Sequence, residues 1–317
     1  MGCRWNGEWE KQSGDCTHTA QATLTRNGMA EQNAANIIRA YIGKMPSLPT
    51  TVGKILEIAN NPQASPADLN KVINLDPVLM GKVLKLINSA YYSLPNKITS
   101  LARAIIMLGI NTVKNLALNT AVLSNVVSSA GRQALDLNGF WRHSIAVGVT
   151  AKMIAQRRKV DQKHIEEYFI AGLLHDIGKV PLNNRLPEEY LRALASAGSS
   201  RISLWQAEQT SIGINHVEVG LLVADNWSLG QNVRDAVEFH HQPTDYSGSS
   251  KEIVWIVAAA NYLVVSAEIG FSGDLYPSQL PEQVFQYLKI DLGFLDEIEE
   301  EVGKRIEQAQ IFLKIAQ

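Results

Sequence analysis

Apolar residues along most of the chain recur every three or four positions, the spacing that gathers them on one face of an α-helix. We see no alternating apolar and polar pattern of the kind that marks a half-exposed strand. The first part of the pattern predicts helices over about 50–59, from Pro66 onward, over 77–88, between Ser100 and Gly109, and over 111–128. The second part predicts helices over about 139–158, 162–176, 187–197, 203–210, 215–227, 231–240, 252–269 and 281–288. The predicted fold class is therefore all-α.

Local signals support several of these helix starts. Ser65-Pro66-Ala67-Asp68 offers a capping serine, a proline at the first helical position and an acid three residues after the cap. Asp76-Pro77 begins the next helix, and Ser100 can cap the one that ends at Gly109. The longest apolar run, residues 253–267, contains Asn261 and is too short to span a bilayer comfortably, so we interpret it as a buried core helix.

A change in the character of the chain predicts its domain organisation. Residues 1–28 are polar and without periodicity, and they form either a disordered leader or a stretch upstream of a true start at Met29. We expect an N-terminal helical lobe over 29–130 and a second lobe over 131–290. The tail, 291–317, is predicted to be an amphipathic helix, with its acids early and its basic residues late, as the helix dipole favours.

Composition narrows the classes of function. The 317 residues are 46% hydrophobic and 19% charged, which provides material for a sizeable core. The net charge of −2 gives no basic patch for nucleic acid or for a membrane surface. The two cysteines, Cys3 and Cys16, lie in the polar leader, so we predict neither a disulfide framework nor a cysteine-based zinc site. A chain poor in cysteine but containing seven histidines suits the cytoplasm.

The chemistry centres on Leu173-Leu174-His175-Asp176-Ile177-Gly178-Lys179. Here an apolar helix runs into an adjacent histidine and aspartate and stops at a glycine. Burying a carboxylate is costly unless it is paired or bound to a metal. Imidazole together with carboxylate is a normal ligand set for zinc, iron or manganese. We therefore predict that His175 and Asp176 are metal ligands.

Four further histidines are candidates to join this pair, and each also has a plainer explanation. His143 can be an ordinary hydrogen-bonded histidine on an apolar helix. His216 begins a helix, where side chains are often exposed, although Gly220 would let that helix pack closely on a neighbour. His240 and His241 can simply interact with a helix C-terminus, but two in succession, with Glu238 nearby, favour ligation.

Two other polar residues complete the prediction. Asn261 lies among apolar residues and needs a partner, so it either ligates weakly or orients a ligand. His164 lies on a charged helix start and is interpreted as solvated. Five histidines are too many for one tetrahedral ion but suit two ions bridged by Asp176, with Lys179 as a cation at the rim that can hold a phosphate oxygen.

These residues resemble a known family. The order of His143, His175-Asp176 and the polar residue at 261 is similar to the pattern of the HD phosphohydrolase superfamily, and the first lobe resembles its HDOD subgroup, a bacterial signalling domain. The matching segments are Leu48-Pro49, Asp76-Pro77, Asn88-Ser89-Ala90, Ala104-Ile105, Leu108-Gly109 and Leu116. The resemblance covers about residues 45–265. It implies an HD-type helical bundle with an N-terminal HDOD lobe, in a bacterial cytoplasmic protein with a regulatory role.

The histidine set is also similar to the HD-GYP branch, whose members hydrolyse cyclic di-GMP at a site with two or three metals. The chain departs from that branch in two ways: Gln242-Pro243 follows the histidine pair in place of the GYP signature, and Asn261 stands where the superfamily has its last aspartate. An amide in place of a carboxylate removes one negative charge and should weaken metal binding.

Two functions follow as hypotheses. The first is a signalling module that binds a partner protein or a small phosphate-containing ligand and retains a metal site. The second is a metal-dependent phosphohydrolase, in which Asp176 bridges two ions and Lys179 steadies the phosphate. We favour the first, since fold alone does not fix function.

Overall fold

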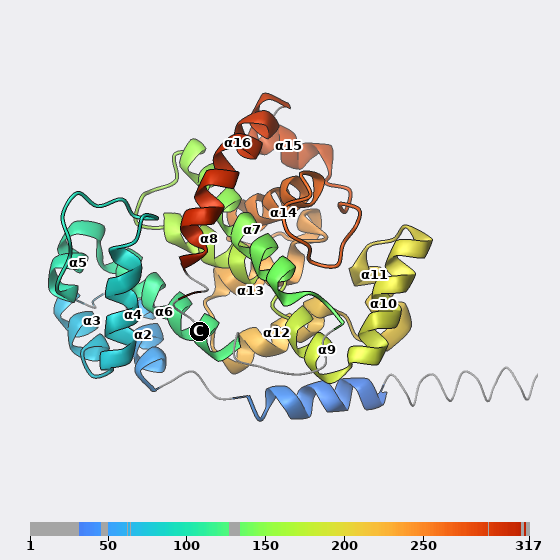
Figure 1. Cartoon of the computed structure of the whole chain (residues 1–317), viewed down its shortest axis with the longest axis horizontal. Coiled ribbons are helices and arrows are strands. Elements are labelled where there is room, and N and C mark those ends of the chain that lie inside the picture. The colour runs from blue at the N-terminus through green and yellow to red at the C-terminus, as the bar shows by residue number, and fades with distance from the viewer. Residues whose placement is uncertain are drawn as a thin grey trace, which may run out of the picture.

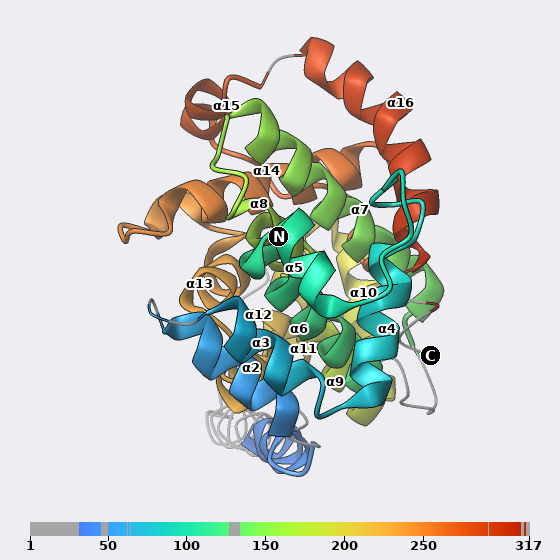
Figure 2. The same ribbon diagram turned by 90° about the vertical axis from the view of Figure 1, so that its left-hand side faces the viewer.

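The structure is a computed structural model that describes residues 32–45, 50–61, 63, 65–126, 134–290, 292–311 and 314. Within these residues the regular elements are helices and no strand is present, so the all-α prediction is confirmed (Figure 1, Figure 2). The predicted leader and the lobe boundary near residue 130 lie outside the described residues.

The N-terminal part begins with a helix over 32–42. It continues with α2 (Thr50–Asn60), α3 (Pro66–Ile73), α4 (Pro77–Ile87), α5 (Leu101–Leu108) and α6 (Ile110–Val126). These helices share a core whose fully buried members include Ile55, Leu69, Ile73, Val83, Leu86 and Leu116. Figure 1 shows α2 to α5 gathered on one side of the molecule, with α6 reaching toward the rest, whereas the helix over 32–42 lies below α9 and α12.

Capping side chains define the starts of these helices as expected. The amide of Asp68 donates to Ser65 Oγ at 3.3 Å and the amide of Ser65 donates to Asp68 Oδ2 at 3.0 Å, which is a complete capping box. Asp76 Oδ1 accepts from the amide of Leu79 at 2.9 Å at the start of α4. Gly109 ends α5 with a φ of 84°, a backbone conformation that favours glycine.

Asn88, which follows α4, holds the long connection to α5 in place. Its Nδ2 donates to the carbonyl of Leu84 at 2.8 Å and to that of Ile98 at 2.7 Å, and its Oδ1 accepts from the amide of Ile98 at 2.7 Å. One side chain thus satisfies backbone groups of Leu84 and Ile98, fourteen residues apart, which fixes the loop that carries Tyr91 and Tyr92.

The remainder of the chain forms the larger part of the molecule. Its helices are α7 (Leu137–Arg157), α8 (Ile165–Leu174), α9 (Lys179–Arg185), α10 (Pro187–Ser200), α11 (Leu204–Ile212), α12 (His216–Asn226), α13 (Gln231–Phe239), α14 (Lys251–Ser266), α15 (Glu282–Leu288) and α16 (Leu292–Ala309), with a short 3₁₀ turn η1 at Pro243–Asp245. Helix α9 was not predicted, because seven residues that include Pro181 show too little periodicity to be recognised.

Helices α7, α8 and α14 form the centre of this part, and α13 packs on α8 (Figure 1). A Cβ atom on Gly172 would lie 2.8 Å from the Cα of Gly148, so two glycines allow α7 and α8 to touch backbone to backbone. Residues Ile253 to Ala260 of α14 are all buried, which confirms the prediction of a core helix there.

No single helix in the described part of the chain is long and apolar enough to cross a membrane. Helix α5 and the first half of α6 meet that criterion only as a pair, and they are bent by 119°.

Candidate metal centre

The turn between α8 and α9 carries the central carboxylate. Helix α8 ends at Leu174, two residues earlier than predicted, so His175 and Asp176 lie in the turn and Gly178 precedes α9. A Cβ atom on Gly178 would overlap the carbonyl oxygen of His216. A Cβ atom on Gly220 would lie 2.7 Å from Val237 Cγ1, which confirms that this glycine permits close helix packing. The two glycines therefore bring the first turn of α12 against Asp176.

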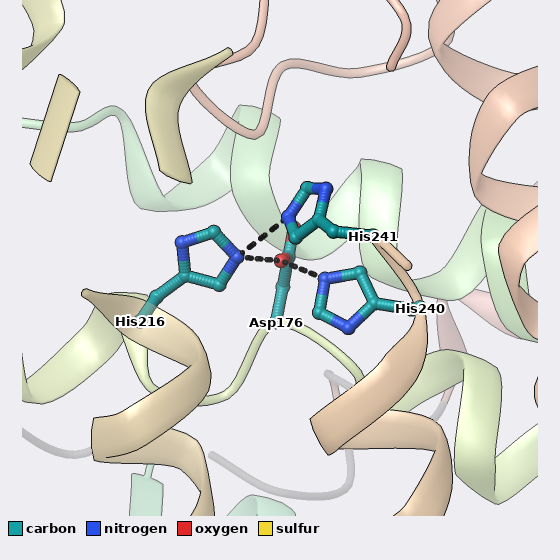
Figure 3. Close-up of side chains that lie close together, drawn as sticks. All are labelled: Asp176, His216, His240 and His241. Atoms are coloured by element: carbon teal, nitrogen blue, oxygen red, sulfur yellow. Dashed lines mark hydrogen bonds and ion pairs between the residues drawn. The ribbon is translucent and has the colours of Figure 1, made fainter. Parts of the chain in front are cut away.

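Asp176 lies between two pairs of histidines. Its Oδ1 is 3.2 Å from His216 Nε2 and 3.5 Å from His240 Nε2 (Figure 3). Its Oδ2 is 3.2 Å from His175 Nε2 and 4.0 Å from His143 Nε2. All four rings and the carboxylate are at most 4% exposed. Each oxygen of the carboxylate thus faces its own pair of imidazole nitrogens.

His241 joins the group on the Oδ1 side. Its Nε2 is 3.0 Å from His216 Nε2, its Nδ1 is 3.1 Å from Ser278 Oγ, and its ring stacks on Trp205 with a centroid distance of 5.5 Å. The structure therefore brings together all six residues predicted as metal ligands, from α7, the α8–α9 turn, α12 and the end of α13.

Hydrogen bonds at the far nitrogens orient three of these rings. His175 Nδ1 donates to the carbonyl of Gly172 at 2.7 Å, and His240 Nδ1 donates to that of Val237 at 2.9 Å. His216 Nδ1 donates to Glu208 Oε2 at 2.6 Å, and the same oxygen accepts the amide of His216 at 2.8 Å. With the proton on Nδ1, the lone pair of each Nε2 is directed at Asp176.

The protonation states suit a ligand set. Burial, helped by the nearby His175, lowers the pKa of His143 to about 3. Burial likewise lowers the pKa of His240 to about 4 and that of His241 well below its usual value. Although burial opposes ionisation of Asp176, His175 and Lys179 hold its pKa well below the usual value. Neutral imidazoles around an ionised carboxylate are the forms that bind metals.

These observations test whether a divalent metal fits. The Nε2 atoms of His143, His175 and His240 are buried without a hydrogen-bond partner among the described residues, a costly arrangement that a metal ion would satisfy. The possible ligand atoms form two groups, each with its atoms within 4.8 Å of one another: Asp176 with His216, His240 and His241, and Asp176 with His143 and His175. The donor set, its spacing and its orienting hydrogen bonds all fit a divalent metal.

Lys179 differs from its prediction. The expectation that it lies at the rim is wrong, because its side chain is fully buried. Its Nζ is 2.8 Å from Asp176 Oδ2 and 2.9 Å from Asp274 Oδ2, and it donates to the carbonyl of Ser272 at 3.1 Å. The loop after α14 covers this lysine and supplies Ser272 and Asp274, so Lys179 ties that loop to the central carboxylate.

Sequence reasoning missed two acids of the site. Asp274 pairs with Lys179, and its Oδ1 accepts from the amide of Leu204 at 2.8 Å. Glu208 is fully buried and orients His216. Neither has a local motif: Asp274 lies in an irregular loop, and Glu208 stands eight residues before the histidine that it contacts. The acid that was noticed, Glu238, instead pairs with Arg234 at 2.8 Å.

Asn261 lies beside the cluster. It lines a small pocket together with His240, His241, Asp274 and Ser278, and its Oδ1 is buried without a hydrogen-bond partner. The space in this pocket is about 10 Å³, room for roughly one water molecule. His164, by contrast, keeps a side chain that is 45% exposed and lies 3.1 Å from Glu167, in agreement with its assignment away from the metal.

Fold and site together define an all-helical protein with a buried histidine–aspartate cluster. The sequence model of the HDOD domain family matches residues 45–243, more than half of the chain. The chain therefore belongs to the HDOD family. All six clustered residues fall inside the matched region, whereas Asn261 and Asp274 follow it.

Comparisons with individual proteins find relatives at low sequence identity. An uncharacterised protein of Treponema pallidum (strain Nichols) is 24% identical over 249 residues, 78% of this chain, and the chain spans about half (47%) of that relative's length. An HDOD domain protein of unknown function from Geobacter sulfurreducens superposes with a TM-score of 0.68 at 24% identity, covering 90% of this chain and 98% of that one.

Two further solved structures share the fold. A candidate phosphohydrolase from Shewanella amazonensis SB2B has a TM-score of 0.66 at 21% identity, covering 89% of this chain and 98% of that one. A candidate signal-transduction protein from Marinobacter aquaeolei VT8 has a TM-score of 0.69 at 20% identity, covering 90% of this chain and 66% of that one. At such identities the likeness establishes the fold alone.

Proposed function

We propose that this protein is a bacterial, cytoplasmic HDOD regulator that binds a divalent metal at the histidine–aspartate cluster and acts by binding a partner protein or a small phosphate-containing ligand. The observation that carries the proposal is the position of Asp176, whose two oxygens face separate pairs of imidazole nitrogens in a fully buried site. A cluster of this kind is costly to bury unless its charged and polar atoms are paired or bind a metal.

The residues that would hold the metal divide into two groups that share Asp176. His216, His240 and His241 form one group, and His143 and His175 form the other. Imidazole and carboxylate suit iron, manganese and zinc alike, and a shared carboxylate suits two neighbouring ions. A bound divalent ion would supply positive charge to polarise a phosphate ester or to lock the surrounding helices together.

Three features favour a regulatory role over turnover. The pocket beside His240 and His241 has room for roughly one water molecule, so a nucleotide would need the loop that carries Asp274 to move. Lys179, the cation expected to hold phosphate, is already paired with two carboxylates. Asn261 contributes no charge where the superfamily pattern has an aspartate, which lowers the charge available to hold a second ion.

A metal-dependent phosphohydrolase is the second candidate, and the retention of the whole histidine set favours it. In that role Asp176 and the five histidines would hold the two ions, and Glu208 would keep the His216 lone pair directed at the site. Movement of Asp274 away from Lys179 would free the lysine to neutralise a phosphate oxygen.

Metal content and turnover distinguish the two candidates. We expect metal in freshly purified protein, measured by elemental analysis, and its loss in Asp176→Ala but not in the control His164→Ala. Hydrolysis of bis(p-nitrophenyl) phosphate and of cyclic di-GMP is then assayed with added Mn²⁺ or Fe²⁺. Metal without turnover supports the regulator. Turnover that Asp176→Ala abolishes and His164→Ala retains makes the protein a phosphohydrolase, and the same low metal content in wild type and Asp176→Ala overturns both.

A further inference from the structure

A second cavity, of about 220 Å³, lies where the N-terminal helices meet α8 and α13, and none of its lining residues belongs to the metal centre. Its apolar walls are Ile55 of α2, Leu118 of α6, Ile170 of α8 and Val233 of α13. Its polar lining consists of Lys114, Asn115, Glu167, Gln231 and Asn232.

Helix α13 begins at this cavity without a capping side chain. Gly230 occupies the cap position, and its carbonyl accepts the amides of Val233 and Arg234. Among the described residues, no acceptor contacts the amides of Gln231 and Asn232, so two backbone donors at the positive end of the helix dipole remain open. Such a terminus favours a negatively charged group.

Asn115 provides an independent sign of a missing ligand. The residue is only 4% exposed, yet its Nδ2 is buried without a hydrogen-bond partner in the described part of the chain. A buried amide donor left in this state costs free energy unless a bound group accepts from it. Asn115 lines the cavity, but its Nδ2 has almost no accessible surface, so its amide must turn toward the cavity before an acceptor there can satisfy it.

Two charged side chains, Lys114 and Glu167, line the cavity. The half-buried Lys114 has no carboxylate partner among the described ion pairs, and its Nζ is 3.5 Å from Asn111 Oδ1. The one carboxylate of the lining, Glu167, is already engaged, with one oxygen 3.1 Å from His164 Nδ1 and the other accepting from Asn232 Nδ2 at 2.9 Å. The groups that can still accept a ligand are therefore donors, and the positive charge of Lys114 is offset only in part by Glu167.

We propose that this cavity binds a small organic anion. Its charged group would accept hydrogen bonds from Lys114, Asn115 and the first amides of α13, and its apolar part would lie against Ile55, Leu118, Ile170 and Val233. This site is separate from the metal centre and does not depend on the function proposed for it.

The position of the cavity gives the ligand a means of influencing the metal centre. Helix α13 starts at the cavity with Gly230 and ends at His240 and His241, about 15 Å further on at 1.5 Å per residue. Helix α8 contributes Glu167 and Ile170 to the cavity and leads directly into His175 and Asp176. Helix α13, which leads into His240 and His241, and helix α8, which leads into His175 and Asp176, therefore both reach the cavity, together with α6 of the N-terminal part.

The test uses the metal-free, full-length protein, so that no probe can bind to a metal ion. Binding of butyrate and of inorganic phosphate is followed by ligand-observed NMR at constant ionic strength. For a ligand of this size we expect saturable butyrate binding in the millimolar range, with phosphate weaker because it lacks an apolar part. Lys114→Met should weaken butyrate binding about tenfold, because a charged hydrogen bond is lost, and the exposed Lys54→Met should leave it within about twofold.

Gly230→Asp gives a second test that loss of folding cannot imitate. A Cβ atom at Gly230 meets nothing within 4 Å, and an aspartate there can cap α13 with its own carboxylate. We expect a higher melting temperature together with loss of butyrate binding. The proposal is overturned if butyrate does not saturate the wild type, if Lys114→Met and Lys54→Met bind it equally, or if Gly230→Asp binds it as the wild type does.

Discussion

Glu208 shows how one side chain can determine the properties of a metal ligand. The same oxygen of Glu208 accepts both the backbone amide and the Nδ1 proton of His216, so it fixes the position and the tautomer of that ring together. Outer partners of this kind commonly change metal affinity by one to two orders of magnitude. The charge of the acid matters as well as its position, because the oxygen of a neutral amide can accept both protons but holds them less strongly than a carboxylate does.

We therefore predict that Glu208→Gln weakens metal binding by roughly 10- to 100-fold while the fold is retained. Metal affinity is measured by competition with a chromophoric chelator, and folding by the helical circular dichroism signal. Glu188→Gln, at an exposed acid of α10, is the matched control and should bind metal as the wild type does. Equal affinities in the two variants would show that Glu208 does not act through His216.

At Asn261 a substitution can add a negative charge beside the cluster, where Glu208→Gln removes one. Its side chain shares the small pocket with His240 and His241, and its buried Oδ1 has no partner among the described residues. A carboxylate at this point would add a negative charge beside the cluster, where charges interact strongly.

We expect Asn261→Asp to tighten metal binding by about tenfold, which corresponds to roughly 1.4 kcal/mol of binding free energy. The same chelator competition measures it. Asn226→Asp, which adds the same charge at the exposed end of α12, should leave the affinity unchanged. An Asn261→Asp protein with wild-type affinity would place residue 261 outside the reach of the metal.

At the scale of the helices, close packing at glycines assembles the site. Gly178 is essential to this packing, because its backbone lies directly against the first turn of α12. Any side chain at residue 178 would push His216 away from Asp176, and the obstacle is backbone, which cannot rotate aside. By contrast, Gly81 in the middle of α4 has nothing within 4 Å of the place where a Cβ atom would be.

Gly178→Ala should therefore destabilise the protein by roughly 2–4 kcal/mol and weaken metal binding with it. Gly81→Ala should stabilise the protein by about 0.5–1 kcal/mol, since alanine favours the helix interior. Urea unfolding of both variants gives the comparison. A Gly178→Ala protein as stable as Gly81→Ala would contradict the close approach of α9 and α12.

The same helices show what the sequence could and could not reveal. Helix starts were predictable wherever a cap is local, as at Ser65, Asp76 and Ser100. The histidines and Asp176 were predictable as a group because polar residues on buried helices need one another. Asp274, Glu208 and the burial of Lys179 were not predictable, since they depend on contacts between segments 8 to 95 residues apart. Helix α9 was missed because it is too short for a periodic signal.

Across the whole molecule, one buried ion pair connects the loop before α5 to the helices of the metal centre. Lys152 of α7 is 2.6 Å from Glu166 of α8, and their side chains are 12% and 5% exposed. Lys152 also donates to Tyr91 OH at 3.3 Å and lies 4.8 Å from the centre of its ring. Loss of one partner of such a pair leaves a buried charge without compensation.

We predict that Lys152→Met costs roughly 3–5 kcal/mol of unfolding free energy, because Glu166 is then buried alone. The double variant Lys152→Met with Glu166→Leu should recover most of that loss, since neither charge remains. Chemical denaturation of the wild type, of Lys152→Met, of Glu166→Leu alone and of the double variant gives the coupling energy between the two residues. A double variant less stable than Lys152→Met would mean that the ion pair is not the source of the effect.

Lys152 and Tyr91 also make the contact between the loop before α5 and helix α7 sensitive to alkaline pH. Burial raises the pKa of Tyr91 to about 12, above its ordinary value near 10, and the pKa of Lys152 is also raised, because Tyr91 and Glu166 outweigh the opposing effect of its burial. Both groups hold their protons more tightly in the folded protein than in the unfolded chain. The unfolded chain therefore loses these protons first as the pH rises. Their contribution to stability is complete below about pH 10 and is lost as the pH rises through 12.

Tyr91→Phe removes one of these protons and should flatten the alkaline loss of stability by roughly 1–2 kcal/mol near pH 12, a value that allows for the partial exposure of the ring to solvent. The measurement is the unfolding free energy at pH 9 and pH 12 for the wild type, Tyr91→Phe and the exposed control Tyr276→Phe. If the unfolding free energy of Tyr91→Phe falls between pH 9 and pH 12 as steeply as that of Tyr276→Phe, the loss of stability in alkali does not arise at this contact. If it falls less steeply, the contact between the N-terminal loop and α7 is what alkali weakens.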